Sequence, residues 1–344
     1  MTTTLAKGPG GTPPVLAGRE SAEANRRRVT RVAFALLAPT LIAMAVVVVY
    51  PIVVSIINSL QTDFAAIDPK TGLFEKGGFV GLQNYTNWLL QQCQSGGKTI
   101  TCPAGTNQSQ FYDAIFATFF FTVVTVTLET VIGMWMALIM NRNFRGRGIL
   151  RAAVLVPWAI PTAVTAQLWY FIFATNGVLN SVLHINTLWT ADLWASRWAI
   201  IIADTWKTTP FMALLILAGL QLIPEDTYEA ARMDGASTAQ AFFRITLPLV
   251  RPALVVAILF RTLDALRMYD LPAILTQGGG GGGDATTTLS ILVVRELRQH
   301  IDSASALSTI TFIIIFLVAF LFIRFFGANV TGNPEKSQRV AKEA

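Results

Sequence analysis

Charged residues are scarce in this chain of 344 residues. Asp, Glu, Lys and Arg together make up 13% of it, whereas hydrophobic residues make up 53%. A soluble globular domain typically has about 25% charged residues. The composition therefore excludes an ordinary soluble domain and predicts an integral membrane protein.

Residues that commonly carry out chemistry are also few. The chain has only two histidines, His184 and His300, and neither has a partner at a spacing typical of metal ligands. The phosphate-binding pattern G-x-x-x-x-G-K-[ST] is absent. No cluster of nucleophiles stands near the end of an apolar segment. We therefore expect no metal site, no cofactor and no ATP hydrolysis in this chain, and we do not expect an enzyme.

Long apolar segments dominate the sequence instead. Six of them approach the ~20 residues that a helix needs to cross a bilayer. They are residues 32–60, 113–140, 149–174, 198–222, 253–275 and 305–326. The predicted fold is all-α, with six transmembrane helices. A secondary transporter should show internal repeats, and we find no convincing repeat.

Lysine and arginine predict the orientation of these helices. They concentrate in the first 31 residues and in segments 142–151, 232–251 and 324–342. The alternate connections hold only Lys70, Lys76, Lys98, Arg197, Arg295 and Arg298. The positive-inside rule then places both termini in the cytosol. The net charge of +6 follows from this bias and does not indicate binding to nucleic acid.

The same patterns predict the domain boundaries. Residues 1–30 are polar and without apolar periodicity, so we expect a disordered cytosolic tail. The apolar run that follows is too long for a cleavable signal peptide and is expected to remain as the first helix. Residues 31–327 are the predicted six-helix membrane domain, and residues 328–344 a second cytosolic tail.

A polar loop at residues 222–250, EAARMDGASTAQAFFRITLP in its central part, interrupts the apolar pattern. Pro224 suits the first position of a helix, and Glu225 suits the positive end of its dipole. Gly235 permits a bend before a second short helix, expected at residues 236–246, and Pro248 is expected to close the hairpin. The loop is either a docking site for a soluble partner or an ordinary amphipathic cytosolic loop.

This loop resembles the EAA loop of ABC importer permeases, whose pattern is E-A-A, three residues, G, nine residues and I-x-L-P. In that family it forms a coupling helix that sits in a cleft of the cytosolic ATPase. The resemblance therefore implies a coupling role for a set of residues that includes every fixed position of the pattern. They are Glu229, Ala230, Ala231, Asp234, Gly235, Ile245, Leu247 and Pro248.

A second segment, FVGLQNY at residues 79–85, is similar to the F-x-G-L-x-N-Y segment of MalF-type carbohydrate permeases. With it the resemblance extends over about residues 31–326, and it is strongest to the first permease subunit of mycobacterial trehalose importers. Six consecutive glycines at positions 278–283 depart from the family pattern and put the local conformation there in doubt.

The resemblance implies the MetI/MalF-like fold of type I ABC importers in the inner (plasma) membrane and the import of a sugar, trehalose above all. Maltose-like oligosaccharides and glycerol-phosphate compounds remain alternatives, and a secondary transporter is a further one. The implied partners are a second, homologous permease subunit, a dimeric ATPase that binds ATP and Mg, an extracytoplasmic sugar-binding protein or lipoprotein, and membrane lipid.

Charges within an apolar segment are costly, so each is a functional candidate. The fifth segment carries charges at a spacing of three, which lets each neighbouring pair form an ion pair. They are Arg261, Asp264, Arg267 and Asp270. Our hypothesis is that Asp264 and Arg267 face the translocation pathway, whereas the outer two contact neighbouring helices or the membrane boundary. A purely structural ion-pair network is the alternative. Tyr269 and Trp206 either stack on a sugar ring or anchor the helices at the membrane interface.

Other polar residues lead to local predictions. Asp204 and Lys207 are three apart and are expected to pair with each other, whereas Glu129 is expected to find a partner on another helix. Cys93 and Cys102 lie nine residues apart and form either a disulfide or two free thiols. Residues 284–303 are too charged to span the bilayer, and their pattern predicts an amphipathic helix outside the bilayer core.

Overall fold

The computed structural model describes residues 14–62, 64–67, 74–95, 98–281 and 283–326. The predicted C-terminal tail and residues 1–13 lie outside this part of the chain. Helix α1 begins at Pro14, so the predicted disordered tail is wrong for residues 14–30, which are helical. The described chain divides between Ile57 and Asn58 into two compact units.

The described part of the first unit, residues 14–57, is helical. It contains α1 (Pro14–Met44), a π-helical turn (Ala45–Val49) and most of α2 (Tyr50–Ser59). Residues Val29–Ser59 form a candidate membrane span, and none of its most apolar window is buried. Side chains such as Leu36 and Val47 are exposed by 75% and 72%. A helix that is apolar on every side fits a lipid environment.

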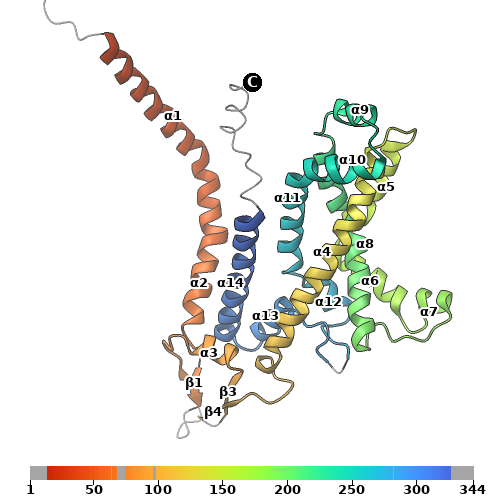
Figure 1. Ribbon diagram of the computed structural model, residues 1–344. Helices are drawn as coiled ribbons and strands as arrows, with labels where there is room; N and C mark the ends of the chain where they lie inside the picture. Colours follow the sequence, from red (N-terminus) through yellow and green to blue (C-terminus); the bar gives the residue numbers. More distant parts are fainter. Residues whose placement is uncertain (1–13, 63, 68–73, 96–97, 282, 327–344) are drawn as a thin grey trace, which may run out of the picture. The chain divides into compact units, whose positions relative to one another are not determined.

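The second unit is a helical bundle built around α4 (Phe111–Asn141) and α8 (Leu193–Leu220), which pack against each other. A helix of Thr238–Ala265 lies beside them, and α14 (Ile301–Phe326) is the last long helix of the described chain (Figure 1). Glycine permits close packing here. A Cβ atom on Gly219 of α8 would lie 2.4 Å from Cβ of Ala253.

The third predicted span is broken. It consists of α5 (Arg147–Ala159) and α6 (Thr162–Phe173), and the chain bends by 89° between α5 and the helical segment 162–183, which includes α7 (Val178–Leu183). The described chain thus has five helices long and apolar enough to span a membrane, or six when the bent pair counts as one. This confirms the predicted all-α, six-span class.

Several predicted span boundaries are wrong, those of the second, fourth, fifth and last spans by four residues or more at one end or both. The fifth span, predicted at residues 253–275, starts earlier and ends at Ala265, and a separate helix, α12 (Asp270–Leu275), follows it. The last span begins at Ile301 rather than at residue 305. The amphipathic helix predicted for residues 284–303 is shorter, since α13 covers Leu289–Leu297.

Small elements gather at one end of the bundle. The hairpins are β1 (Phe64–Ile67) with β2 (Phe74–Lys76) and β3 (Gln92–Ser95) with β4 (Lys98–Thr101), both antiparallel. Helix α3 (Gln83–Leu89) packs on α14, where buried Trp88 donates from Nε1 to the carbonyl of Ser303 at 3.0 Å. A short 3-10 helix, Gln108–Gln110, leads into α4. Cys93 and Cys102 are joined by a disulfide.

Candidate functional site

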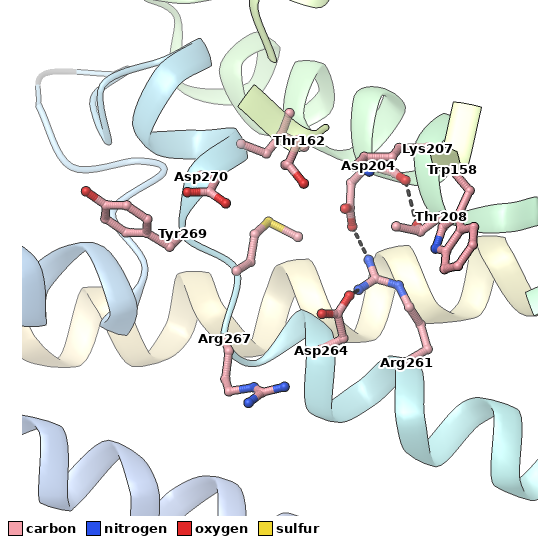
Figure 2. Close-up of a pocket in the computed structure, with 12 residues that line it drawn as sticks. Trp158, Thr162, Asp204, Lys207, Thr208, Arg261, Asp264, Arg267, Tyr269 and Asp270 are labelled. Atoms are coloured by element: carbon pink, nitrogen blue, oxygen red, sulfur yellow. Dashed lines mark hydrogen bonds and ion pairs between the residues drawn. The ribbon is translucent and has the colours of Figure 1, made fainter. Parts of the chain in front are cut away.

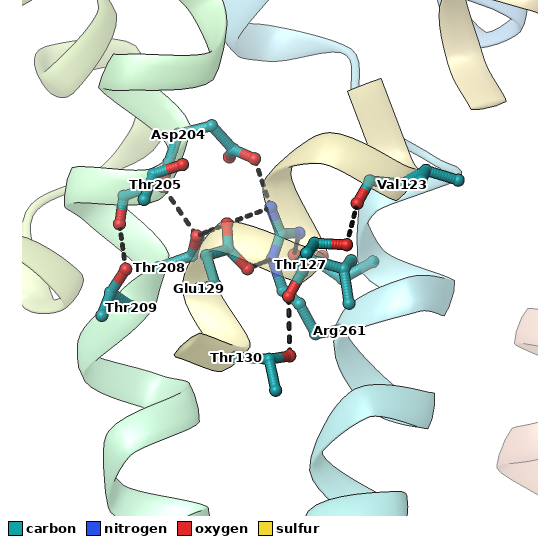
Figure 3. A network of polar contacts seen from close by, with 11 residues as sticks. Val123, Thr127, Glu129, Thr130, Asp204, Thr205, Thr208, Thr209 and Arg261 are labelled. Carbon is teal, nitrogen blue, oxygen red and sulfur yellow. Dashed lines mark hydrogen bonds and ion pairs between the residues drawn. The ribbon is translucent and has the colours of Figure 1, made fainter. Parts of the chain in front are cut away.

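A buried ion-pair cluster joins the three central helices. Arg261 on α11 (Leu247–Ala265) has an exposed fraction of 2%, and Glu129 on α4 is fully buried. Arg261 donates from Nε to Glu129 Oε2 at 2.5 Å and from Nη2 to Glu129 Oε1 at 3.0 Å. Its Nη2 also pairs with Asp204 of α8 (Figure 3). One guanidinium therefore crosslinks α4, α8 and α11.

Two further polar groups complete the cluster. Arg261 Nη1 lies 2.8 Å from Oδ2 of Asp264, whose side chain is 66% exposed. Thr208 places its hydroxyl 2.5 Å from Glu129 Oε1 and 2.6 Å from the carbonyl oxygen of Asp204. Three carboxylates thus surround one guanidinium, and all except Asp264 are buried. A buried cluster of this kind contributes geometry more than stability, because desolvation offsets much of the attraction.

The cluster forms one wall of a polar cavity of about 290 Å³. Both signs of charge and two aromatic rings line this cavity (Figure 2). The lining residues are Trp158, Thr162, Asp204, Lys207, Thr208, Arg261, Asp264, Arg267, Met268, Tyr269, Asp270 and Leu271. Paired donors and acceptors beside aromatic rings are the groups that bind a solute rich in hydroxyls and apolar C–H faces.

The predicted ladder on the fifth span forms only in part. Among the described residues Arg261 pairs with Asp264, whereas Arg267 donates from Nε to the carbonyl of Leu263 at 3.2 Å. The reason is that α11 ends at Ala265, so the periodicity of one continuous helix does not extend to Asp270.

Most of the predicted pathway residues nevertheless line the same polar cavity. The cavity wall includes Arg261, Asp264, Arg267, Tyr269 and Asp270. Trp206 is separate from them. It lines an apolar cavity of about 490 Å³ and packs edge-on against Trp169, with ring centroids 5.8 Å apart.

The predicted pair of Asp204 and Lys207 is wrong. Asp204 turns to Arg261, and Lys207 donates from Nζ to the carbonyl oxygen of Ile160 at 3.0 Å. The prediction that Glu129 meets a partner on another helix is confirmed by Arg261. Sequence reasoning missed Thr208, Thr162 and Ile160. Pro161, directly before α6, is a local signal of the break that brings Ile160 to Lys207.

The predicted coupling hairpin lies at the end of the bundle opposite to the disulfide loop (Figure 1). Helix α9 (Glu225–Met233) begins directly after Pro224, which takes the N-cap position rather than the first helical one. Gly235 has a φ of +75°, which favours glycine. Ser237 and Gln240 then form a capping box that starts α10 (Thr238–Ala241).

The second half of the hairpin differs from the prediction. Instead of ending at Pro248, the chain continues from α10 through a π-helical turn, Phe242–Thr246, into α11. Pro248 lies in the first turn of α11, and the wider π-helical turn comes directly before this helix. In this position the proline does not end the helical run. One helical run thus extends from the hairpin to Ala265, just past the buried cluster.

The hairpin presents an exposed surface with apolar side chains. Glu229, Ala230 and Gly235 are exposed, and Met233 and Phe243 are exposed by 88% and 65%. Tyr228 anchors the first helix from inside, with its hydroxyl 3.1 Å from Thr246 Oγ1. Exposed apolar residues rimmed by charges are typical of a protein interaction site.

Known transport proteins are similar to this chain in sequence and in fold. Residues 129–332 match the family described as binding-protein-dependent transport system inner membrane component. The chain is 38% identical over 302 residues to the trehalose/maltose transport system permease protein MalF of Thermococcus litoralis, with 86% of this chain and 94% of the relative covered. It is 36% identical over 312 residues to the trehalose transport system permease protein SugA of Mycobacterium tuberculosis, covering 90% and 93%.

Two other matches are less similar. The sulfoquinovosyl glycerol transport system permease protein SmoG of Agrobacterium fabrum is 34% identical over 249 residues, covering 71% of this chain and 73% of the relative. A chain of a bacterial ABC transporter that imports the polysaccharide alginate has the same fold, with a TM-score of 0.69 at 19% identity, and 90% of this chain and 99% of that chain are covered.

Proposed function

The chain belongs to the family of inner membrane components of binding-protein-dependent transport systems, as a MalF-type permease, and we propose that it forms half of the pathway of an ABC importer for trehalose. The relatives named for trehalose match this chain over nine tenths of their length at 36–38% identity. Maltose-like oligosaccharides are the nearest alternative solutes, followed by glycerol-phosphate compounds.

The charge balance of the cavity carries the proposal of an uncharged solute. Its lining holds as many cations as carboxylates, so the formal charges cancel. The cations are Lys207, Arg261 and Arg267, and the carboxylates are Asp204, Asp264 and Asp270. A site for a sulfonate or phosphate is expected to carry an excess of positive charge. A neutral wall with many donors and acceptors instead favours a neutral disaccharide.

Coupling to an ATPase rests on the hairpin. The distribution of Lys and Arg supports a cytosolic position for this hairpin and for both termini. Its exposed small residues, Ala230 and Gly235, allow another backbone to approach closely, whereas Ile245 and Leu247 are half-buried and fix the hairpin to the bundle. Glu229, Ala231, Asp234 and Pro248 complete the proposed coupling surface.

The continuous helical run supplies a path for mechanical coupling. The run of Thr238–Ala265 begins in the hairpin and carries Arg261 and Asp264 near its other end. A displacement of the hairpin by the ATPase therefore shifts α11 against α4 and α8, to which Arg261 is bonded. ATP binding would open the cavity to the outside, and hydrolysis would return it toward the cytosol.

The proposed complex contains four kinds of component. Beside this chain stand a second, homologous permease, a dimeric ATPase that binds ATP and Mg, and an extracytoplasmic sugar-binding lipoprotein. A solved structure of an alginate ABC transporter in complex with its alginate-bound periplasmic protein supports such an arrangement by fold. Membrane lipid is expected to cover the exposed apolar side chains of α14, such as Phe316 and Phe320.

Reconstitution tests this proposal directly. The complete complex is placed in nanodiscs, and ATP hydrolysis is measured with the binding protein empty, loaded with trehalose, or loaded with sulfoquinovosyl glycerol. We expect strong stimulation only by the trehalose-loaded protein. Equal stimulation by the sulfonated compound would contradict the argument from charge balance, and no stimulation by any sugar would contradict the proposed function.

A further inference from the structure

The third span breaks at a point that leaves backbone groups without helical partners. Helix α5 ends at Ala159 and α6 starts at Thr162. The last carbonyls of a helix have no N–H donor inside it, and Pro161 has no N–H to offer them. In a membrane an unsatisfied carbonyl costs several kcal/mol. The break therefore needs a donor from elsewhere in the bundle.

Helix α8 supplies that donor and a second contact. Lys207 donates from Nζ to the carbonyl oxygen of Ile160 at 3.0 Å. Four residues later, Phe211 stacks on the ring of Trp158, with centroids 5.8 Å apart and ring planes 18° apart. Residues four apart lie on the same face of a helix. One face of α8 thus contacts the end of α5 twice, at Trp158 in its last turn and at Ile160 directly after it.

The charge of Lys207 suits this role. A cation is favoured at the negative end of a helix dipole, and a hydrogen bond from an ammonium group is stronger than one between neutral groups. Lys207 is half-buried, and it also lines the polar cavity. Trp158 before the break and Thr162 after it line the same cavity. The bend therefore decides which groups of the third span reach the cavity.

We propose that Lys207 is a positioning residue that holds the bend between α5 and α6 and so keeps Trp158 and Thr162 on the cavity wall. Its ammonium group acts on the solute pathway through the backbone of Ile160. The proposal rests on the proposed function only in taking this cavity as part of the sugar pathway.

The test uses a cysteine at Thr162 as a reporter. The complete complex carrying Thr162→Cys is treated with a water-soluble thiol reagent, and the labelling rate is compared with that of the same complex carrying Lys207→Met. We expect the rate to fall about tenfold, which corresponds to about 1.4 kcal/mol, the low end for one charge-assisted hydrogen bond. Lys207→Arg keeps a donor at this position and is expected to restore the rate.

Two further variants distinguish the positioning role of Lys207 from the effect of its charge and from a failure of the protein to fold. Arg267→Gln removes a positive charge from the same cavity, but Arg267 bonds to Leu263 rather than to the break. It should leave the labelling rate unchanged. Phe211→Leu keeps the cavity charge, loosens the stack on Trp158, and should lower the rate in the same direction. It also provides the test if the methionine variant does not fold.

The outcomes are distinct. An unchanged rate in Lys207→Met, or an equal fall in Arg267→Gln, would overturn the inference. Neither result bears on whether the wild-type complex imports sugar, and failure of the wild-type complex to do so would count against the proposed function alone.

Discussion

Arg261 Nε and Glu129 Oε2 lie 2.5 Å apart in the middle of the bundle, although 132 positions separate the two residues in the chain. Both side chains are almost fully buried. Because Glu129 is on α4 and Arg261 follows the coupling hairpin on one helical run, this contact joins the proposed ATPase-binding end to the most extensive helix packing of the bundle, the pair of α4 and α8.

Removing the guanidinium should destabilise the bundle strongly. Arg261→Met leaves Glu129 and Asp204 buried without their cation, and breaking a buried pair typically costs about 3–5 kcal/mol. The free energy of unfolding of the purified chain, measured in detergent by denaturant titration, is expected to fall by this order. Arg267→Met, at an exposed position, is the matched control and should change it by only about 0.5 kcal/mol. Equal losses in the two variants would refute the assignment of the cluster.

Asp264 allows the transport role to be separated from the structural one. Asp264→Asn keeps an oxygen that accepts from Arg261 but gives the cavity lining a net positive charge. We expect trehalose uptake to fall about tenfold or more, an effect of at least about 1.4 kcal/mol, while the amount of assembled complex stays the same. Asp192→Asn, at an exposed position outside the cavity lining, is the control. Normal uptake by the Asp264 variant would end its assignment to the pathway.

Gly235 tests the coupling hairpin. A Cβ atom there meets nothing within 4 Å in this chain, but the φ of +75° strains a branched side chain. Gly235→Val is therefore expected to insert in the membrane and yet to lose binding of the ATPase, as measured by recovery of the complex on an affinity-tagged ATPase.

Gly235→Asn is the informative companion, because asparagine tolerates the left-handed region. If the backbone conformation is what the ATPase needs, this variant retains binding. If the absence of a side chain is what matters, it loses binding as the valine variant does. Full recovery and full activity of the valine variant would contradict the assignment of the hairpin.

The disulfide between Cys93 and Cys102 can be tested by comparing single and double cysteine variants. Cys93→Ser, Cys102→Ser and the double variant should lower the stability of the loop equally, since each removes the same crosslink. A disulfide typically contributes about 2–4 kcal/mol, and this short loop should lie at the low end. Limited proteolysis of the purified complex measures the effect. A double variant that is cleaved much faster than either single one would show that the cysteines act separately.

Hydropathy and local spacing predicted the parts of this fold that depend on single segments. The helix of Glu225–Met233 after Pro224 and the number of spans follow from residues close together in sequence. The end of α11 at Ala265 does not, because the residues that follow, 266–275, continue the spacing of three between charges and end in another apolar stretch. Nothing in their hydropathy marks the turn before Tyr269.

The site was predictable only in its residue types. Buried charge in a membrane segment predicts a partner. Glu129 is expected to find one on another helix, whereas Arg261 is expected to contact neighbouring helices or the membrane boundary. Which carboxylate Arg261 holds, and that Lys207 bonds to a backbone oxygen rather than to Asp204, depend on how α4, α8 and the broken span meet. Contacts between residues that are 47 or 132 positions apart cannot be predicted from the local spacing of residues in the sequence.

The most direct test of the central claim is the uptake of labelled trehalose by cells that lack this chain, with and without its restoration. We expect uptake to be lost in the deletion strain, to return with the wild-type chain, and to stay low with Asp264→Asn despite normal amounts of protein in the membrane. Uptake that does not depend on the chain, with the protein shown to be in the membrane, would contradict trehalose as its solute.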